Sequence, residues 1–411
     1  MAISNHSNTP HLAHSTGNNQ FALITLTALF FMMGFITSLN DILIPHLKAI
    51  FDLTYFQAML VQFCFFTAYA VMSIPMGKLV EKIGYQNGVV GGFLLTALGC
   101  LLFYPAAGSH SYPVFLGALF ILATGVTLLQ VAGNPYVTLL SKPNQAARTL
   151  TLVQAFNSLG TTIAPLLGSA LILVDALQTA EEKVRAVQMP YLGLAGVLIL
   201  LAIVVRLLRL PDARQSASEE ITHSADGKSS AWQYPHLVYG AAAIFCYVGA
   251  EVAIGSLLIN VMEEAAGVTH ETGAKYLAVY WGGAMVGRFI GSAAMSKIVA
   301  NKALTFNASV ALLLVFSAMA LGGNVAMWAL LAIGLFNSIM FPTIFSLATE
   351  GLGKFTGQAS GIICTAIVGG AIVPLLQGFA ADQIGLLASF SVSAACYAYI
   401  VFFATKAYRF R

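Results

Sequence analysis

The chain has 411 residues, of which 58% are hydrophobic and 9% are charged, and its formal net charge is +3. Soluble globular proteins carry roughly 25% charged residues, which they need to cover a water-facing surface. A soluble globular protein is therefore excluded, and the small net charge gives no reason to expect a nucleic-acid partner. The mean hydropathy of +0.82 favours a chain embedded in a lipid bilayer.

The apolar segments are long enough to cross a membrane as helices, which takes about 20 residues each. Residues 1–20 contain no Lys or Arg, and the apolar run after them is too long for a signal-peptide core, so we expect no cleavable signal peptide. Breaks at charged residues, prolines and glycine clusters predict an all-α membrane protein with twelve transmembrane helices. These helices are expected at 21–48, 56–78, 86–105, 113–140, 149–174, 188–209, 236–262, 272–297, 302–322, 325–349, 359–380 and 383–405.

One long polar segment, 210–235, lies in the middle of the chain. It divides the predicted helices into two bundles of six, 21–209 and 236–405, with a tail at either end, 1–20 and 406–411. Most Lys and Arg residues of the connections fall on the same side of the membrane as this linker. The positive-inside rule therefore predicts that the linker and both termini are cytoplasmic.

The two predicted bundles are related in sequence. LTLVQAFNSLGTTIAPLL (150–167) aligns without gaps on ASGIICTAIVGGAIVPLL (359–376), so that Gly160 matches Gly369. Pro135 similarly matches Pro342 at nearly the same offset. Internal duplication in a protein with many membrane spans indicates a transporter whose two halves rock around a central site.

Polar side chains inside membrane helices are costly, so each is a candidate functional residue. Asp41 and Glu251 are the only acids clearly within the predicted helices. Asp41 either marks the outer end of its helix or is a working carboxylate inside the membrane. Glu251, four residues after Tyr247, either binds substrate or is a neutral packing group held by hydrogen bonds.

Amide side chains accompany these acids at Gln130, Asn134, Gln154, Asn157 and Asn337. Gln130 and Asn134 share one helix face, as do Gln154 and Asn157, because residues three or four apart are neighbours on a helix. These amides either line a cavity or join helices, where a hydrogen bond contributes about 1 kcal/mol. Asn134 precedes Pro135 and could instead cap the carbonyls that this proline frees.

The predicted helix at 272–297 adds aromatic and basic candidates. Tyr280 and Trp281 are either stacking platforms in a cavity or ordinary core residues, and Arg288 is expected near the cytoplasmic end, packed there or serving a gate. No Lys or Arg is expected at the middle depth of the membrane, which disfavours an anionic substrate. Acids, amides and aromatic rings instead match a neutral polyhydroxylated solute such as a sugar.

Several motifs make the chain recognisable as a whole: LNDILIPHL, LTYFQAMLVQFCFF, GNPYVTLL, QAFNSLGTTIAP, CYVGAEVAIGS, GGAMVGRFIGS, FPTIFSLA and VGGAIVP. With them the chain resembles the fucose permease branch of the major facilitator superfamily along nearly its whole length. NDILIPHL, QMPYLGL and FNSIMFPTIFSLAT are most similar to the bacterial glucose/galactose transporters of that branch. GKLVEKIG (77–84) is similar to the superfamily's signature in this loop, which implies a gating or structural role for Gly77 and Lys78.

The departures from the fucose permeases concern the coupling ion. Those permeases carry an acid at the Asp41 position and a second acid in helix four, where this chain has Gln130, and a glutamine where it has Glu251. The glucose/galactose relatives share the helix-four glutamine and are associated with sodium coupling. The resemblance therefore implies Na⁺ as the co-transported ion, with Asp41 and Gln130 as its metal site and Asn134 beside them.

We therefore expect a monomeric, cation-coupled hexose symporter of a bacterial inner membrane, working by alternating access, with glucose or galactose as substrate. The substrate contacts are expected from Gln154, Asn157, Tyr247, Glu251, Tyr280, Trp281 and Asn337. Proton-coupled symport of fucose or an amino sugar is the alternative, and a non-transporting sugar sensor is a more distant one. The sequence shows no nucleophile–base pair, metal cluster or phosphate-binding glycine loop, so we expect neither catalysis nor a cofactor.

Overall fold

The computed structural model describes residues 16–51, 55–108, 111–142, 144–171, 180–208, 229–268 and 270–410. The first helices are α1 (Thr16–Phe51), α2 (Tyr55–Ile83), α3 (Tyr85–Gly108), α4 (Tyr112–Leu140), α5 (Ala146–Leu171) and α6 (Ala180–Leu207). The later ones are α8 (Pro235–Ala266), α9 (His270–Ala294), α10 (Ala300–Leu321), α11 (Gly323–Asn337), α12 (Met340–Thr349), α13 (Thr356–Thr365), α14 (Gly369–Ile384), α15 (Leu386–Ser389) and α16 (Ser391–Thr405). Short 3₁₀ turns complete them: η1 (Ala231–Gln233), η2 (Gly353–Phe355), η3 (Ala366–Val368) and η4 (Ala407–Arg409). Every regular element in the described ranges is thus helical, as the sequence predicts.

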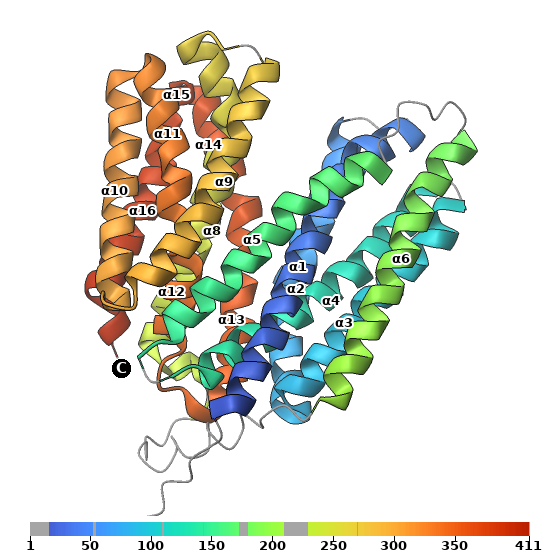
Figure 1. The fold of residues 1–411 in the computed structure, drawn as a ribbon. Coiled ribbons are helices and arrows are strands. Elements are labelled where there is room, and N and C mark those ends of the chain that lie inside the picture. The colour runs from blue at the N-terminus through green and yellow to red at the C-terminus, as the bar shows by residue number, and fades with distance from the viewer. Residues whose placement is uncertain are drawn as a thin grey trace, which may run out of the picture.

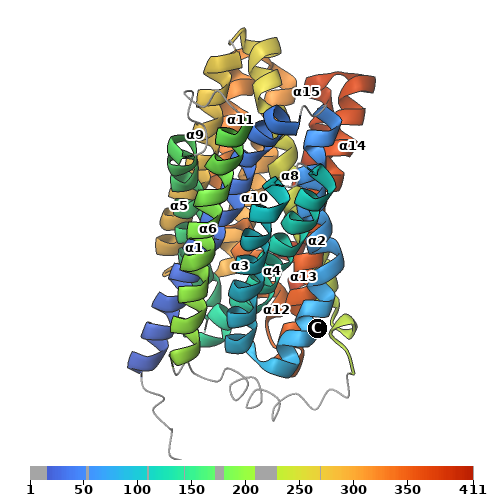
Figure 2. The same ribbon diagram turned by 90° about the vertical axis from the view of Figure 1, so that its right-hand side faces the viewer.

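The helices form two groups, α1–α6 and α8–α16, which converge at one end (Figure 1). At the lower end of that view α13 lies against α2 and α4, and α5 lies against α9 and α12. Toward the upper end the two groups separate. The view turned by 90° shows that most helices run roughly along one common direction (Figure 2), which suits a membrane protein.

Ten helical segments within the described part of the chain are long and apolar enough to cross a membrane. They include every long helix or pair of consecutive helices except α5 and α9. Large apolar side chains lie exposed on the outer helices, for example Leu200 and Ile203 on α6 and Phe306 and Leu313 on α10. Such exposure costs little in lipid, whose tails are as apolar as these side chains.

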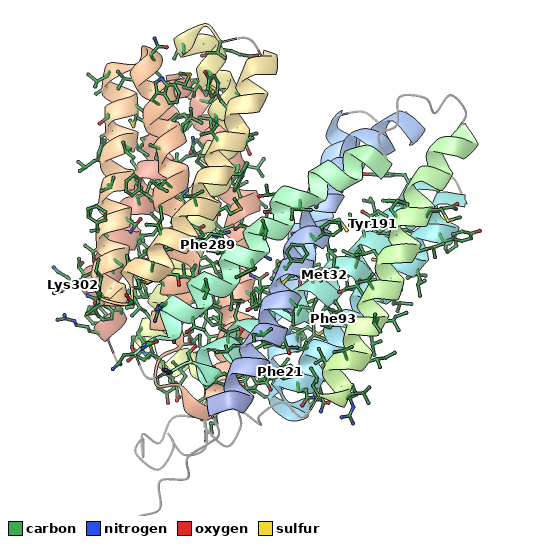
Figure 3. The ribbon with its side chains drawn as sticks, viewed as in Figure 1. Phe21, Met32, Phe93, Tyr191, Phe289 and Lys302 are labelled. Carbon is green, nitrogen blue, oxygen red and sulfur yellow. The ribbon has the colours of Figure 1, made fainter. Side chains whose placement is uncertain are left out.

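Inside each group the helices are joined by large apolar and aromatic side chains. Phe93 of α3 and Tyr191 of α6 are almost fully buried, and both belong to the main hydrophobic core. Figure 3 shows them with Met32 of α1 among the sticks that fill the group α1–α6. In the same figure Phe289 of α9 lies where that helix faces α5, and its ring meets Phe156 edge-on at a centroid distance of 5.8 Å.

The helix predicted at 325–349 is not continuous, because α11 ends at Asn337 and α12 begins at Met340. The sequence explains the break. Pro342 has no N–H to donate to the carbonyl four residues earlier, which belongs to Ser338. That carbonyl instead accepts a hydrogen bond from Nε of Arg288 at 3.2 Å. The helices predicted at 359–380 and 383–405 are likewise divided, the first by η3 and the second between α15 and α16.

The predicted internal repeat has a direct counterpart in the packing. A Cβ atom at Gly160 of α5 would overlap the carbonyl oxygen of Phe31 in α1, and one at Gly369 of α14 would overlap that of Phe245 in α8. The two glycines that align in sequence therefore each let a helix approach the first helix of its own group. Only a residue without a side chain permits such a close backbone approach.

Candidate functional site

A cavity of about 270 Å³ lies between the two groups of helices. It is lined by Thr37, Phe65, Phe66, Tyr69, Gln130 and Gln154 from the first group and by Tyr247, Val248, Glu251, Arg288, Phe341 and Ile367 from the second. Polar groups and aromatic rings thus face each other across the interface between the groups. This composition is typical of small-molecule sites, which combine apolar walls with a few placed polar atoms.

Two glutamines supply the amides of the cavity, and each has one end held by a neighbour. The hydroxyl of Tyr69 donates a hydrogen bond to Oε1 of Gln130 at 2.8 Å. Nε2 of Gln154 donates to Oδ1 of Asn134 at 3.3 Å. The Gln130 amide is therefore held by its oxygen, which leaves its NH₂ group to donate to a ligand. The Gln154 amide is held by its nitrogen, which leaves its oxygen to accept from a ligand.

Glu251 is the acid of the cavity, and tyrosines hold both its side chain and its backbone. The hydroxyl of Tyr247, one helical turn earlier, donates to Oε1 of Glu251 at 2.8 Å. The hydroxyl of Tyr280 donates to the Glu251 backbone oxygen at 3.1 Å. Behind it, Nδ2 of Asn337 donates to the Tyr280 hydroxyl at 3.0 Å, and the Tyr397 hydroxyl donates to Oδ1 of Asn337 at 2.8 Å.

Arg288 also lines this cavity, which corrects the expectation of a central site without Lys or Arg. Its Nε donates a hydrogen bond to the carbonyl of Ser338, and its Nη1 donates one to the hydroxyl of Ser158 in α5. Arg288 thus connects the cavity, the broken helix α11–α12 and the opposite group of helices. The gating role considered for Arg288 from the sequence stays a prediction.

At the convergent end the two groups are held by backbone and side-chain hydrogen bonds. Arg148 of α5 donates from Nε to the carbonyl of Ser292 at 3.2 Å, and the Ser292 hydroxyl donates to the Arg148 carbonyl at 3.1 Å. The hydroxyl of Ser360 in α13 donates to the carbonyl of Val131 in α4 at 2.9 Å. Val131 is four residues before Pro135, so Ser360 satisfies the carbonyl that this proline frees.

The loop signature noted in the sequence lies at the crossing of α2 and α13. A Cβ atom at Gly77 would come within 2.8 Å of the Gly357 carbonyl oxygen. One turn later Glu81 accepts a hydrogen bond from the backbone N–H of Gln358 at 2.7 Å, in the first turn of α13, where a carboxylate also meets the positive end of the helix dipole. Gly77 therefore permits close contact between the groups, whereas Lys78 is exposed.

Several residues expected at the site do not line the cavity. Nδ2 of Asn157 donates to the Phe30 carbonyl at 2.8 Å, so this amide joins α5 to α1. Trp281 is 45% exposed, and its ring meets that of Tyr280 edge-on at 5.1 Å. Asn134, Tyr280 and Asn337 are fully buried and form the layer of contacts behind the lining. Asn134 accepts from Gln154 and does not cap the carbonyl freed by Pro135.

Asp41 belongs to helix α1, but its side chain falls outside the described residues.

The sequence reasoning missed Tyr69 and the aromatic wall made by Phe65, Phe66 and Phe341. The stretch QFCFFTAY in α2 could have indicated Phe65, Phe66 and Tyr69, since it places aromatic residues three and four apart, on one helix face.

Residues 26–374 match the family described as the Major Facilitator Superfamily. The chain is 56% identical over 408 residues to a protein of Brucella abortus biovar 1 (strain 9-941) named glucose/galactose transporter, covering 98% of both chains. It is 36% identical to the L-fucose-proton symporter of Escherichia coli (strain K12), covering 93% of this chain and 92% of the other. A crystal structure of the transporter FucP in the outward conformation matches with a TM-score of 0.85 and 33% identity, over 94% of this chain and 98% of that chain. By its sequence and by the arrangement of its helices, the chain belongs to the major facilitator superfamily.

Proposed function

We propose that this protein is a secondary active transporter that carries a neutral hexose such as glucose or galactose into the cell together with a cation. The observation that supports this most directly is the cavity between the two groups of helices, where Gln130, Gln154 and Glu251 face aromatic rings. Sugar hydroxyls both donate and accept hydrogen bonds, so they suit a site with carboxylate and amide groups. The close similarity to a protein named glucose/galactose transporter supports the same substrate class.

The transport cycle proposed is alternating access in a bacterial inner membrane. α5 and α9 cross the membrane in addition to the ten apolar segments, which gives twelve crossings and leaves both termini on one side. The distribution of Lys and Arg makes this the cytoplasmic side. The C-terminus lies at the convergent end (Figure 1), so this end faces the cytoplasm. The conformation described therefore has its cytoplasmic side closed. Sugar and cation bind in the cavity of a single chain, and the two groups rock to open the other side, with no covalent step.

Na⁺ is the coupling ion that we propose first, bound by Asp41 and Gln130 close to Asn134. The Gln130 oxygen accepts one hydrogen bond from Tyr69, and an amide oxygen has a second lone pair that is available to a cation. Bound Na⁺ neutralises the Asp41 carboxylate, which lowers the cost of closing the site around it. Proton coupling is the second candidate, because relatives of this chain are named L-fucose-proton symporters.

Radiolabelled glucose uptake into proteoliposomes tests both candidates, with an inward Na⁺ gradient and an inward proton gradient imposed separately. We expect accumulation with Na⁺ alone, and the Asp41→Asn variant should lose accumulation while it still exchanges sugar by counterflow. Accumulation with protons alone would mean that H⁺ is the coupling ion and that it binds to the carboxylate of an acidic residue. Absence of uptake and counterflow for glucose, galactose and fucose would contradict the proposed function. Unimpaired accumulation by Asp41→Asn would remove Asp41 from the coupling-ion site.

For Glu251→Gln we expect a half-saturation concentration for glucose that is raised roughly tenfold, because a charge-assisted hydrogen bond to the sugar becomes a neutral one. The maximal rate should change less. Glu264→Gln is the matched control, since Glu264 lies on the same helix with an exposed side chain. An unchanged sugar affinity in Glu251→Gln, measured by uptake at varied glucose concentration, would remove Glu251 from the substrate site.

A further inference from the structure

The hydrogen bond between Tyr69 and Gln130 fixes which end of the Gln130 amide is free. A tyrosine hydroxyl has one proton, and Tyr69 gives it to Oε1 of Gln130 at 2.8 Å. The NH₂ group of the amide then points away from Tyr69, with two protons to donate. Among the described residues, no acceptor for Nε2 of Gln130 is found, and Gln130 lines the cavity.

Tyr69 itself is well placed to hold this orientation. Its side chain is only 4% exposed, and its ring packs against that of Phe65 at a centroid distance of 5.6 Å. Phe65 lies one turn earlier on α2, so the position of the Tyr69 hydroxyl is set by the helix and by this ring contact. Gln130 has one more rotatable side-chain bond than a tyrosine, so the hydrogen bond orders its amide rather than the Tyr69 ring.

We propose that Tyr69 is a positioning residue that turns the Gln130 amide so that its NH₂ group donates to a substrate hydroxyl. Gln154 has the opposite arrangement, since its nitrogen is engaged by Asn134 and its oxygen is left to accept. The two glutamines of the first group therefore select a ligand with one hydroxyl that accepts and another that donates. The remaining lone pair of the Gln130 oxygen stays available to the coupling ion.

This inference rests on the proposed function, because it names a determinant of sugar affinity. Equilibrium binding of radiolabelled glucose to the purified protein is measured for the wild type, Tyr69→Phe, Gln130→Ala and the double variant. We expect Tyr69→Phe to weaken binding roughly fivefold to tenfold, since the amide is then free to turn. In the Gln130→Ala background the same change should have no further effect, because Tyr69 acts through Gln130.

Tyr191→Phe is the matched control. It removes a buried hydroxyl from α6, outside the cavity lining, and should leave glucose affinity unchanged. Wild-type affinity in Tyr69→Phe would overturn the inference. An equal loss with and without Gln130 would overturn it as well, since it would mean that Tyr69 merely supports the fold.

A second measurement distinguishes failure of this inference from failure of the proposed function. Thermal unfolding of the four proteins without sugar reports the Tyr69–Gln130 interaction directly, and the shifts in Tm of the single variants should exceed, when added, the shift of the double variant. Additive shifts would overturn the inference even if no hexose binds. Absence of hexose binding by the wild type together with non-additive shifts would instead reject the proposed function alone.

Discussion

Gly160→Ala and Gly369→Ala should each destabilise the protein by about 3 kcal/mol, because the new methyl group has no room. The overlap is with backbone oxygens, of Phe31 and Phe245 respectively, which cannot rotate away as a side chain can. The helices must therefore separate along the whole crossing, α5 from α1 or α14 from α8. In thermal unfolding of the detergent-solubilised protein, we expect Tm to fall by roughly 3–4 °C, because the unfolding entropy of a chain of this length is large.

Gly117→Ala and Gly196→Ala are the controls for these variants. Both glycines lie inside helices of the first group, α4 and α6, and a Cβ atom at either has no heavy atom within 4 Å. Alanine is the better helix former, so Tm should be unchanged or slightly raised. Equal effects of all four substitutions would contradict the close crossings at Gly160 and Gly369.

Arg288→Met should lower the initial rate of sugar transport about 100-fold, equivalent to about 3 kcal/mol, because it removes the partner of three groups at once. The Ser338 carbonyl at the helix break loses its donor, the contact to Ser158 across the two groups is lost, and Glu251 loses the cation that lines the same cavity. The measurement is counterflow exchange in proteoliposomes, which requires no ion gradient.

Two further variants establish whether charge or geometry is lost. Arg288→Lys keeps the charge but cannot reproduce a planar fork that donates in two directions, so it should recover part of the rate only. Arg206→Met removes an exposed arginine at the end of α6 and should leave transport unchanged. Near-normal exchange by Arg288→Met would exclude Arg288 from the transport cycle.

The fold was accessible from the sequence because the features that determine it are local. Lengths of apolar segments predict helices, and the matched glycines predict the repeat whose close crossings the structure contains. The break after Asn337 was not predicted, although Pro342 identifies the carbonyl involved. A proline inside a membrane helix can leave the helix intact, as Pro135 does in α4, and the outcome depends on which donor lies nearby.

The site was predictable in residue types more than in roles. Gln130, Gln154, Tyr247, Glu251 and Arg288 do meet at one cavity. Hydrogen-bond partners, however, depend on which helices lie side by side. Helical spacing could not reveal that Ser360, from the other group, serves the carbonyl freed by Pro135, or that Tyr69 faces Gln130.

Arg288 is shared between the cavity and the contact that joins the two groups of helices, and this has a consequence for the economy of transport. A cotransporter dissipates an ion gradient whenever it changes conformation while carrying the ion without the sugar. An occupant that draws the guanidinium toward the cavity takes it from Ser158, so the occupant and the Ser158 contact compete for the same donors. In the cotransport proposed above, slippage by the partly loaded protein would then be resisted at the site itself, with no relay through distant parts of the fold.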